Sequence, residues 1–278
     1  MAASVVFDVP ERLVSAAIAT HNNHKVCVNS VCGDTSIAES NVCEHGEEAW
    51  TRCGNLQTLT NAATNGGSYY LDDDITLTDS MTIKSGITLN LCLNGHTITM
   101  SSTRTPLFQV KDGGTLNLCD CKGGGQLTGA KETQYIGGAV YARGIFNMYS
   151  GAITGNSGMY GGVCVPSDNN GTFNMYGGTI SGNYASDTTK GSAVNFMGDK
   201  FEMYGGTITE NNTAHAIDGT SLTIYGGEIT NNNGTGISSS GNFEMYGGKI
   251  SGNKGDSYGG VYIFNRNATF SMYGGEIS

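Results

Sequence analysis

The stretch Phe173-Asn-Met-Tyr-Gly-Gly-Thr-Ile-Ser-Gly-Asn183 decides the fold. Apolar and polar residues alternate in its first half, which predicts a strand with Phe173 and Met175 on one face. The glycine pair then predicts a turn, because glycine adopts backbone conformations that other residues avoid. A second short strand is expected around Ile180, followed by another turn at the Gly-Asn pair.

The same pattern recurs along the chain. Its units begin at Leu89, Leu116, Phe146, Phe173, Phe201, Leu222, Phe243 and Phe270. Repeats of this length that are built from strands predict a solenoid. Most units also contain a third apolar segment, such as Gly162-Val-Cys-Val165. We therefore expect an all-β fold, a single-stranded parallel β-helix with Phe, Met and Ile stacked inside.

An asparagine stands three places after the inward isoleucine in five successive units. These residues are Asn156, Asn183, Asn211, Asn232 and Asn253. Stacked asparagines hydrogen-bond to one another and to turn backbone, so we expect a structural column. Insertions after this column, such as Tyr184–Gly191, predict loops on one side, where recognition usually concentrates.

Composition excludes several classes of protein. The chain has 278 residues, of which 43 are glycine and 14% are charged, which does not fit a coiled coil or a helical bundle. Its apolar stretches are far shorter than the ~20 residues that span a bilayer, so we expect no membrane insertion. The formal charge of −10 would repel a phosphate backbone, so we expect no nucleic-acid partner.

Three segments are expected. Residues 1–20 form an N-terminal segment without the features of a secretory signal, and residues 9–19 could form one short helix. Residues 21–55 form a small Cys/His-rich cap, and residues 56–278 form the β-helix. The last unit stops before its third strand, so we expect a fragment of a longer array, with an open edge that favours end-to-end association.

The cap contains residues of the kind that bind zinc. The predicted ligands are His24, Cys27, Cys32 and His45, with His21 and Cys43 as substitutes. Two closely spaced pairs joined by a loop are a common way to supply four ligands, and a closed set of four makes the metal structural. The alternative is a disulfide-linked cap. That alternative would use Cys27, Cys32, Cys43 and Cys53.

Other cysteines fall within the repeats. Cys92 and Cys119 occupy the position that tyrosine holds in later units. Equivalent residues in adjacent turns lie about 5 Å apart, so either a disulfide between them or two packed thiols would fit. The pattern gives no partner for Cys121 or Cys164.

The chain resembles a known group of proteins. The resemblance rests on His24-Lys-Val-Cys27 with Cys32 and His45, Ala49-Trp-Thr51, Tyr69-Tyr-Leu71, Leu89-Asn-Leu-Cys-Leu-Asn-Gly-His-Thr-Ile98 and the repeated Met-Tyr-Gly-Gly-x-Ile motif. On these residues it is similar to secreted or cell-surface right-handed parallel β-helix repeat proteins of Gram-positive bacteria, and more broadly to the pectate-lyase-like superfold. The resemblance implies a right-handed winding and an extracellular or cell-surface location, because most such proteins look like surface or adhesin modules.

Enzymes on this fold class cleave acidic polysaccharides with clustered carboxylates, and no such cluster is visible. Outward positions of the second strand form a stack of mixed sign. They are Thr179, Thr207, Glu228, Lys249 and Glu276. Glu202 and Glu244 share a column but are separated by one turn, so we expect them roughly 10 Å apart. Asp72–Asp74 is more typical of a polar loop than of a calcium site, and we expect His96 and His215 to be ordinary surface or turn residues.

The outward tyrosines form the remaining candidate site. We expect Tyr176, Tyr204, Tyr225 and Tyr246 to bind a ligand if sugar rings stack on them, and the alternative is that the rings only stabilise neighbouring turns. The favoured function is a non-enzymatic surface module, an adhesin or stalk that binds a glycan or a host protein through its loops or its tyrosines. The alternatives are a polysaccharide lyase or glycoside hydrolase, and a spacer without a ligand.

Overall fold

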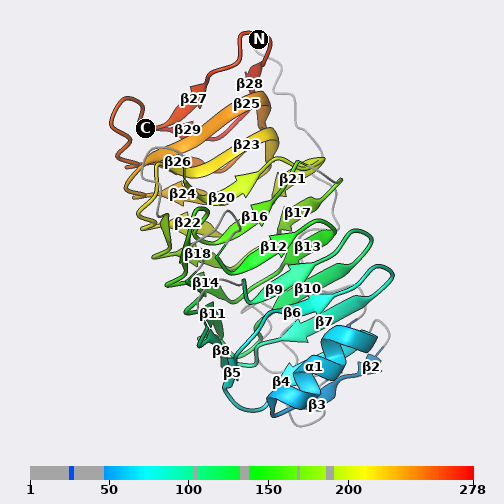
Figure 1. Ribbon diagram of the computed structural model, residues 1–278. Coiled ribbons are helices and arrows are strands. Elements are labelled where there is room, and N and C mark those ends of the chain that lie inside the picture. The colour runs from blue at the N-terminus through cyan, green and yellow to red at the C-terminus, as the bar shows by residue number, and fades with distance from the viewer. Residues whose placement is uncertain (1–24, 28–46, 103–105, 132–137, 168–169, 186–190) are drawn as a thin grey trace, which may run out of the picture.

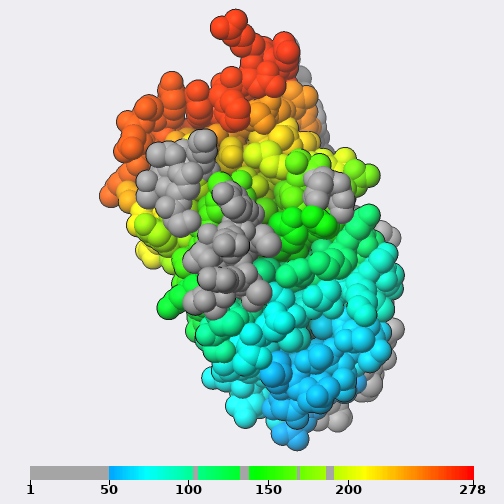
Figure 2. Space-filling view, in the orientation of Figure 1, coloured from blue at the N-terminus to red at the C-terminus, as the bar shows by residue number. Residues whose placement is uncertain are grey.

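The protein is a parallel β-solenoid in its computed structural model, which describes residues 25–27, 47–102, 106–131, 138–167, 170–185 and 191–278. Strands of equivalent position in successive turns pair in parallel and stack along one axis (Figure 1). In the space-filling view the colours change gradually from blue to red along this axis, so neighbouring turns lie on one another (Figure 2). The parallel β repeat predicted from the sequence is confirmed.

Each turn supplies strands to three faces. The Tyr face, named for its outward tyrosines, contains β3 (Thr51–Cys53), β4 (Gly67–Leu71), β7 (Thr88–Cys92), β10 (Thr115–Cys119), β13 (Ile145–Met148), β17 (Thr172–Met175), β21 (Lys200–Met203) and β28 (Phe270–Met272). The second face contains β6 (Met81–Ile83), β9 (Phe108–Val110), β12 (Val140–Ala142), β16 (Val163–Val165), β20 (Ser192–Phe196) and β27 (Val261–Ile263). Two long strands, β23 (His215–Ile224) and β25 (Thr235–Met245), run through both faces and join them into one 16-stranded sheet.

The third face is a separate nine-stranded parallel sheet. It contains β5 (Ile75–Leu77), β8 (Thr97–Met100), β11 (Gln126–Thr128), β14 (Ala152–Thr154), β18 (Thr179–Ser181), β22 (Thr207–Thr209), β24 (Glu228–Thr230), β26 (Lys249–Ser251) and β29 (Glu276–Ile277). Two small pairs complete the structure: parallel β15 (Ser157–Gly158) with β19 (Tyr184–Ala185), and antiparallel β1 (Lys25–Cys27) with β2 (Glu47–Ala49).

The core consists of apolar columns in the predicted register. Phe146, Phe173 and Phe201 pair in order across adjacent turns and are fully buried. The rings of Phe146 and Phe173 stack with their centroids 5.0 Å apart. Because each strand buries alternate residues against the same residue type one turn away, burial of apolar surface fixes the register of the whole stack.

The asparagine column is confirmed. Asn156 Nδ2 donates to Asn183 Oδ1 at 3.1 Å, and Asn183 Nδ2 donates to Asn211 Oδ1 at 3.0 Å. The series continues through Asn232 to Asn253 with two bonds of 2.9 Å. Each buried amide also donates to a backbone carbonyl of a preceding turn, as Asn183 does to Ile153 at 2.9 Å. The column therefore satisfies buried turn backbone as well as itself.

A helix, α1 (Leu56–Asn65), covers one end of the stack (Figure 1). Asn55 caps its N-terminus by accepting a hydrogen bond from the backbone N–H of Thr58 at 2.9 Å. Leu59, Ala62 and Ala63 are buried against β4, β5 and β6. The sequence analysis expected only the β-helix from residue 56 onward, so it missed this helix. Parallel pairing itself already begins at β3.

The second glycine of the Tyr-Gly-Gly turns that follow β17, β21, β23, β25 and β28 is required by the turn. Gly206 has φ +85°, and a Cβ there would lie 2.7 Å from both the carbonyl oxygen of Gly178 and Cε of Met175. Only a residue without a side chain fits such a left-handed position against the previous turn.

Some expectations concern residues outside those described. The short helix at residues 9–19 and the recognition loop centred on residues 186–190 belong to this group. Within the described ranges, no helix has the length and apolar character needed to cross a membrane.

Candidate binding face

The outward tyrosines form one continuous column. Its members are Tyr149, Tyr176, Tyr204, Tyr225, Tyr246 and Tyr273. Neighbouring ring centroids are 4.8 to 5.2 Å apart and the ring planes deviate by 5° to 17°. The rings therefore lie face to face along the stack and turn their edges and hydroxyl groups outward. This stacking agrees with the alternative that the rings stabilise neighbouring turns, and a sugar would meet ring edges and hydroxyl groups rather than a flat strip of ring faces.

A polar row accompanies the tyrosines on the same face. Two residues before each tyrosine, the outward positions are Asn147, Asn174, Glu202, Thr223, Glu244 and Ser271. The first part of this row continues back to Asn90 as an amide ladder. Asn174 donates to Asn147 at 2.8 Å, Asn147 to Asn117 at 2.7 Å, and Asn117 to Asn90 at 2.6 Å. The sequence analysis missed this second ladder, although an asparagine at the centre of four successive units was its signal.

Glu202 lies where this ladder ends. It is only 7% exposed, and its Oε1 lies 2.7 Å from Nζ of Lys200. Its Oε2 accepts a hydrogen bond of 2.9 Å from the hydroxyl of Tyr204. Asn174, the register partner of Glu202, has a buried Oδ1 with no hydrogen-bond partner among the described residues. A carboxylate carries no proton to donate to it, so one acceptor remains unsatisfied here.

The hydroxyls of Tyr149 and Tyr204 are held in their protonated form. Burial, and next the hydrogen bond to Glu202, raise the pKa of Tyr204. Burial raises the pKa of Tyr149 to about 12. A phenol with a raised pKa remains a hydrogen-bond donor at neutral pH and does not act as a proton acceptor. The hydrogen bond to Glu202 raises the pKa of Lys200, which therefore stays cationic.

Glu244 repeats part of this arrangement two turns away. Its Oε2 accepts a hydrogen bond of 3.3 Å from the hydroxyl of Tyr246. The strand register places Thr223 between Glu202 and Glu244, as expected. Two strand spacings separate their backbones by roughly 10 Å, about twice the ~5 Å that separates the carboxyl groups of retaining glycosidases.

The third face carries the mixed-sign ladder predicted from the sequence. Thr207, Glu228, Lys249 and Glu276 follow one another in register, and Lys249 Nζ lies 3.1 Å from Glu276 Oε1. Opposite charges in adjacent turns attract, so this column stabilises the stack. In the part of the chain that the structure describes, no three His, Cys, Asp or Glu side chains gather as a metal ion would require.

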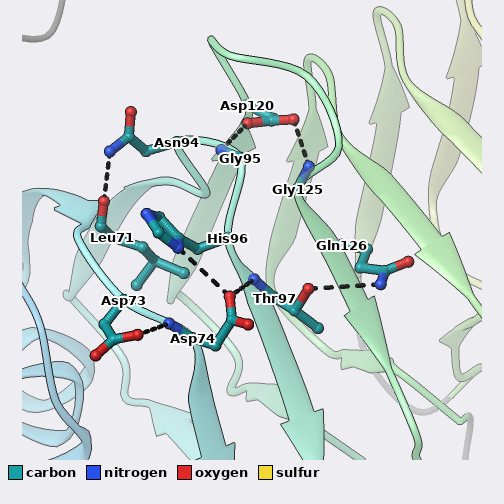
Figure 3. A network of polar contacts seen from close by, with 10 residues as sticks. All are labelled: Leu71, Asp73, Asp74, Asn94, Gly95, His96, Thr97, Asp120, Gly125 and Gln126. Atoms are coloured by element: carbon teal, nitrogen blue, oxygen red, sulfur yellow. Dashed lines mark hydrogen bonds and ion pairs between the residues drawn. The ribbon is translucent and has the colours of Figure 1, made fainter.

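The three aspartates Asp72–Asp74 point to different partners. Asp72 pairs with Arg52, and Asp73 accepts from the backbone N–H of Asp74 at 2.8 Å. Asp74 accepts from the N–H of Thr97 at 2.8 Å and lies 3.4 Å from Nδ1 of the partly exposed His96 (Figure 3). These carboxylates fasten the first turns to one another and do not converge on a cation.

The cysteines of the repeats include one close contact that was not expected. Cys92 and Cys119 are register partners, as predicted, and the sulfur of Cys121 lies 2.7 Å from that of Cys92. Cys121 reaches it because the chain turns back after β10. Cys53 points into the solenoid core, where it is fully buried, and burial raises its pKa to about 11. The side chain of Cys53 therefore packs in the solenoid core.

The predicted zinc ligands lie outside what the structure describes. Of His24, Cys27, Cys32 and His45, only Cys27 belongs to a described strand, β1, and its side chain is not among the described parts. The substitutes His21 and Cys43 also lie outside the described residues.

A buried polar column on the second face was not anticipated. Cys164, Asn195, Asp218 and Ser238 follow one another in register, and three of them are at most 3% exposed. Burial is the main cause that raises the pKa of Asp218 to about 6, against an opposing hydrogen bond from Ser238. Each of the four follows an inward apolar residue, so the alternation of the strand turns its side chain to the opposite side.

Comparisons with known proteins give no relative. No family model, no curated protein and no solved structure matches this chain.

Proposed function

We propose that the protein is a non-enzymatic module of a secreted or cell-surface protein, and that it binds a glycan through the Tyr face. The arrangement around Glu202 carries this proposal. A column of partly exposed tyrosines lies beside the carboxylates of Glu202 and Glu244, which accept hydrogen bonds from the hydroxyls of Tyr204 and Tyr246. A sugar offers hydroxyl groups that both donate and accept, and it could satisfy such a mixed row.

The ligand that fits this face is neutral or cationic. The chain carries a formal charge of −10, and Glu202 and Glu244 add two carboxylates to the face. An acidic polysaccharide would be repelled by this field. This repulsion, together with the separation of the two glutamates, disfavours the alternative of a lyase or glycoside hydrolase acting on an acidic polysaccharide.

The proposal extends to the finer class of the fold. It includes a right-handed winding, a relation to the pectate-lyase-like superfold, and an origin on the surface of a Gram-positive bacterium. The repeated Met-Tyr-Gly-Gly-x-Ile motif and the parallel stack support these points. The binding face would then project from the cell as part of a stalk.

A structural zinc ion in the N-terminal cap is also proposed, with His24, Cys27, Cys32 and His45 as ligands. The antiparallel pairing of β1 with β2 supports it, because the register joins Cys27 to Glu47, which follows His45 by two residues in the sequence. Elemental analysis of protein purified without chelator should give about one zinc per chain. Absence of zinc together with loss of four titratable thiols would instead indicate the disulfide-linked cap.

The experiment for the main proposal is binding of labelled protein to an array of neutral, amino-sugar and acidic glycans, with supernatants analysed for released sugars. A triple variant, Tyr204→Ser, Tyr225→Ser and Tyr246→Ser, should lose binding while keeping its circular dichroism spectrum. The matched control is Tyr258→Ser, because Tyr258 stacks on Tyr262 of the second face at 4.3 Å and lies off the Tyr face.

Each outcome has a definite meaning. Selective binding that the triple variant loses and the control keeps supports the Tyr face as a glycan site. Released sugar would show that the protein is an enzyme. No glycan bound by folded wild-type protein would contradict the proposal and favour a host-protein ligand or a spacer.

A further inference from the structure

Cysteines replace tyrosines at the N-terminal end of the tyrosine column. The strand register places Cys92 and Cys119 at the positions that precede Tyr149 along the stack. Together with Cys121, they form one buried cluster. Trp50, Tyr70 and Tyr149 pack against this cluster, so aromatic side chains enclose the three sulfurs.

Two sulfur atoms of this cluster approach closely. Those of Cys92 and Cys121 lie 2.7 Å apart, although the residues are 29 positions apart in the sequence. A covalent disulfide is about 2.05 Å long. The two sulfurs therefore need to move toward one another by less than about 1 Å to form a bond.

The backbone holds Cys121 in this position through its neighbour. The carboxylate of Asp120 accepts hydrogen bonds from the N–H groups of Gly95 at 2.7 Å and Gly125 at 2.8 Å (Figure 3). Its own N–H donates to Oγ of Ser150 at 2.7 Å. Asp120 is 5% exposed, and a Cβ on Gly125 would lie 2.7 Å from its Cγ. Both turns adjacent to Cys121 are thus fixed around one buried carboxylate.

We propose that Cys92 and Cys121 form a reversible disulfide by exchange with a small-molecule disulfide, while Cys119 stays reduced. Cys121 is the most exposed of the three, so its thiolate attacks the small disulfide first. This step forms a mixed disulfide and releases one small thiol. The Cys92 thiolate then attacks the Cys121 sulfur and releases the second small thiol. One disulfide and two protein thiols become one protein disulfide and two small thiols, so atoms and electrons balance.

The bond would join two consecutive turns covalently at the start of the tyrosine column. It would close a loop that contains a full turn of the solenoid, from β7 to the turn after β10. Such a link limits the unfolded chain more than the folded one. Oxidation should therefore raise the free energy of unfolding of the N-terminal end of the solenoid.

The test uses the full chain without mutation. Reduced protein is incubated with glutathione disulfide under native conditions, alkylated in denaturant at low pH, and digested with trypsin. Cleavage after Lys84, Arg104, Lys111 and Lys122 gives peptide 85–104 with Cys92, and peptide 112–122 with Cys119 and Cys121. We expect these two peptides to be joined in most molecules, with the alkyl group on Cys119, and to separate after reduction.

Two other results would overturn the proposal. An alkyl group on Cys121 in the joined peptides would assign the bond to Cys92 and Cys119. Separate peptides that carry only glutathione or alkyl groups would show that no bond forms. The control is the same oxidation in urea, where we expect Cys92 to pair with Cys119 in some molecules and with Cys121 in others. The same mixture in the native protein would contradict the proposal that the fold selects Cys121.

Discussion

The hydroxyl of Tyr204 donates a 2.9 Å hydrogen bond to Oε2 of Glu202, two residues earlier in the chain. Glu202 is buried while Tyr204 is half-buried, so the phenol covers the carboxylate and Lys200 closes its other side. The charge of Glu202 and the ionisation of Tyr204 are therefore coupled.

The substitution Glu202→Gln should lower the pKa of Tyr204. Burial is the largest cause that raises this pKa, and the hydrogen bond and charge of Glu202 come next. An amide removes the charge, so the phenol loses protons at lower pH. Ultraviolet difference titration of this variant, with and without Tyr204→Phe, measures the shift. Glu244→Gln, two turns away, should leave Tyr204 unchanged, and an equal effect of both variants would contradict a direct contact.

Asp218→Asn should stabilise the protein at neutral pH and have little effect at acidic pH. The folded state raises the pKa of Asp218 from 3.8 to about 6, chiefly by burial, so folding favours its protonated form. The stabilisation that comes from protonating Asp218 in the folded state is complete below pH 3.8 and is lost as the pH rises through about 6. A pKa difference of about two between the folded and the unfolded protein corresponds to roughly 3 kcal/mol in the free energy of unfolding at most.

Thermal unfolding at pH 4 and pH 7.5 checks this. The difference in Tm between Asp218→Asn and wild type should be positive at pH 7.5 and near zero at pH 4. The exposed Asp256→Asn is the control and should show no such dependence on pH. A gain that is equal at both pH values would show that the charge of Asp218 is not its cause.

Asn183→Ala should destabilise the solenoid strongly. Asn183 donates to Ile153 and Asn211 and accepts from the backbone and side chain of Asn156, all at 2.9 to 3.1 Å. Alanine would leave several buried groups unpaired, at about 1–3 kcal/mol each, so we expect a total loss of roughly 3–5 kcal/mol. Urea denaturation measures it. The exposed Asn212→Ala, whose amide oxygen accepts one bond from Asn233, should cost less than about 1 kcal/mol.

Gly206→Ala should cost more stability than Gly123→Ala. Both glycines have a left-handed φ, at +85° and +78°, so each substitution imposes about 1–2 kcal/mol of backbone strain. At Gly206 the new methyl group would also meet Gly178 and Met175 at 2.7 Å, whereas nothing lies within 4 Å at Gly123. Equal losses in urea denaturation would show that crowding by the previous turn is unimportant.

The repeat made most of the fold predictable. Apolar alternation around Phe173 gave the strands, and recurrence of one residue type fixed which residues stack, including the Asn183 column. Helix α1 interrupts the repeat and was missed. Its signals are local: the capping Asn55, apolar residues at helical spacing, and Gly66 at its end. A search for repeats gives no weight to a segment that occurs once.

The candidate site was less predictable for a geometric reason. Column positions follow from register, so the tyrosines and the order of Glu202, Thr223 and Glu244 were foreseen. Contacts between a strand and the turn that follows it do not follow from register. The approach of Cys121 to Cys92 therefore had to come from the structure, whereas the stacking of the tyrosine rings was one of the two alternatives that the register allowed.

The two asparagine ladders have opposite polarity, and this has a consequence for the Tyr face. Inside the solenoid each amide donates toward the C-terminus, from Asn156 to Asn183, whereas on the Tyr face each donates toward the N-terminus, from Asn174 to Asn147. Aligned amide dipoles reinforce one another in a poorly solvated environment. The Tyr-face ladder thus ends in a carbonyl oxygen whose partial negative charge faces the position of Glu202. Two negative charges therefore meet at this end of the ladder, and the ammonium group of Lys200, 2.7 Å from Oε1 of Glu202, offsets them.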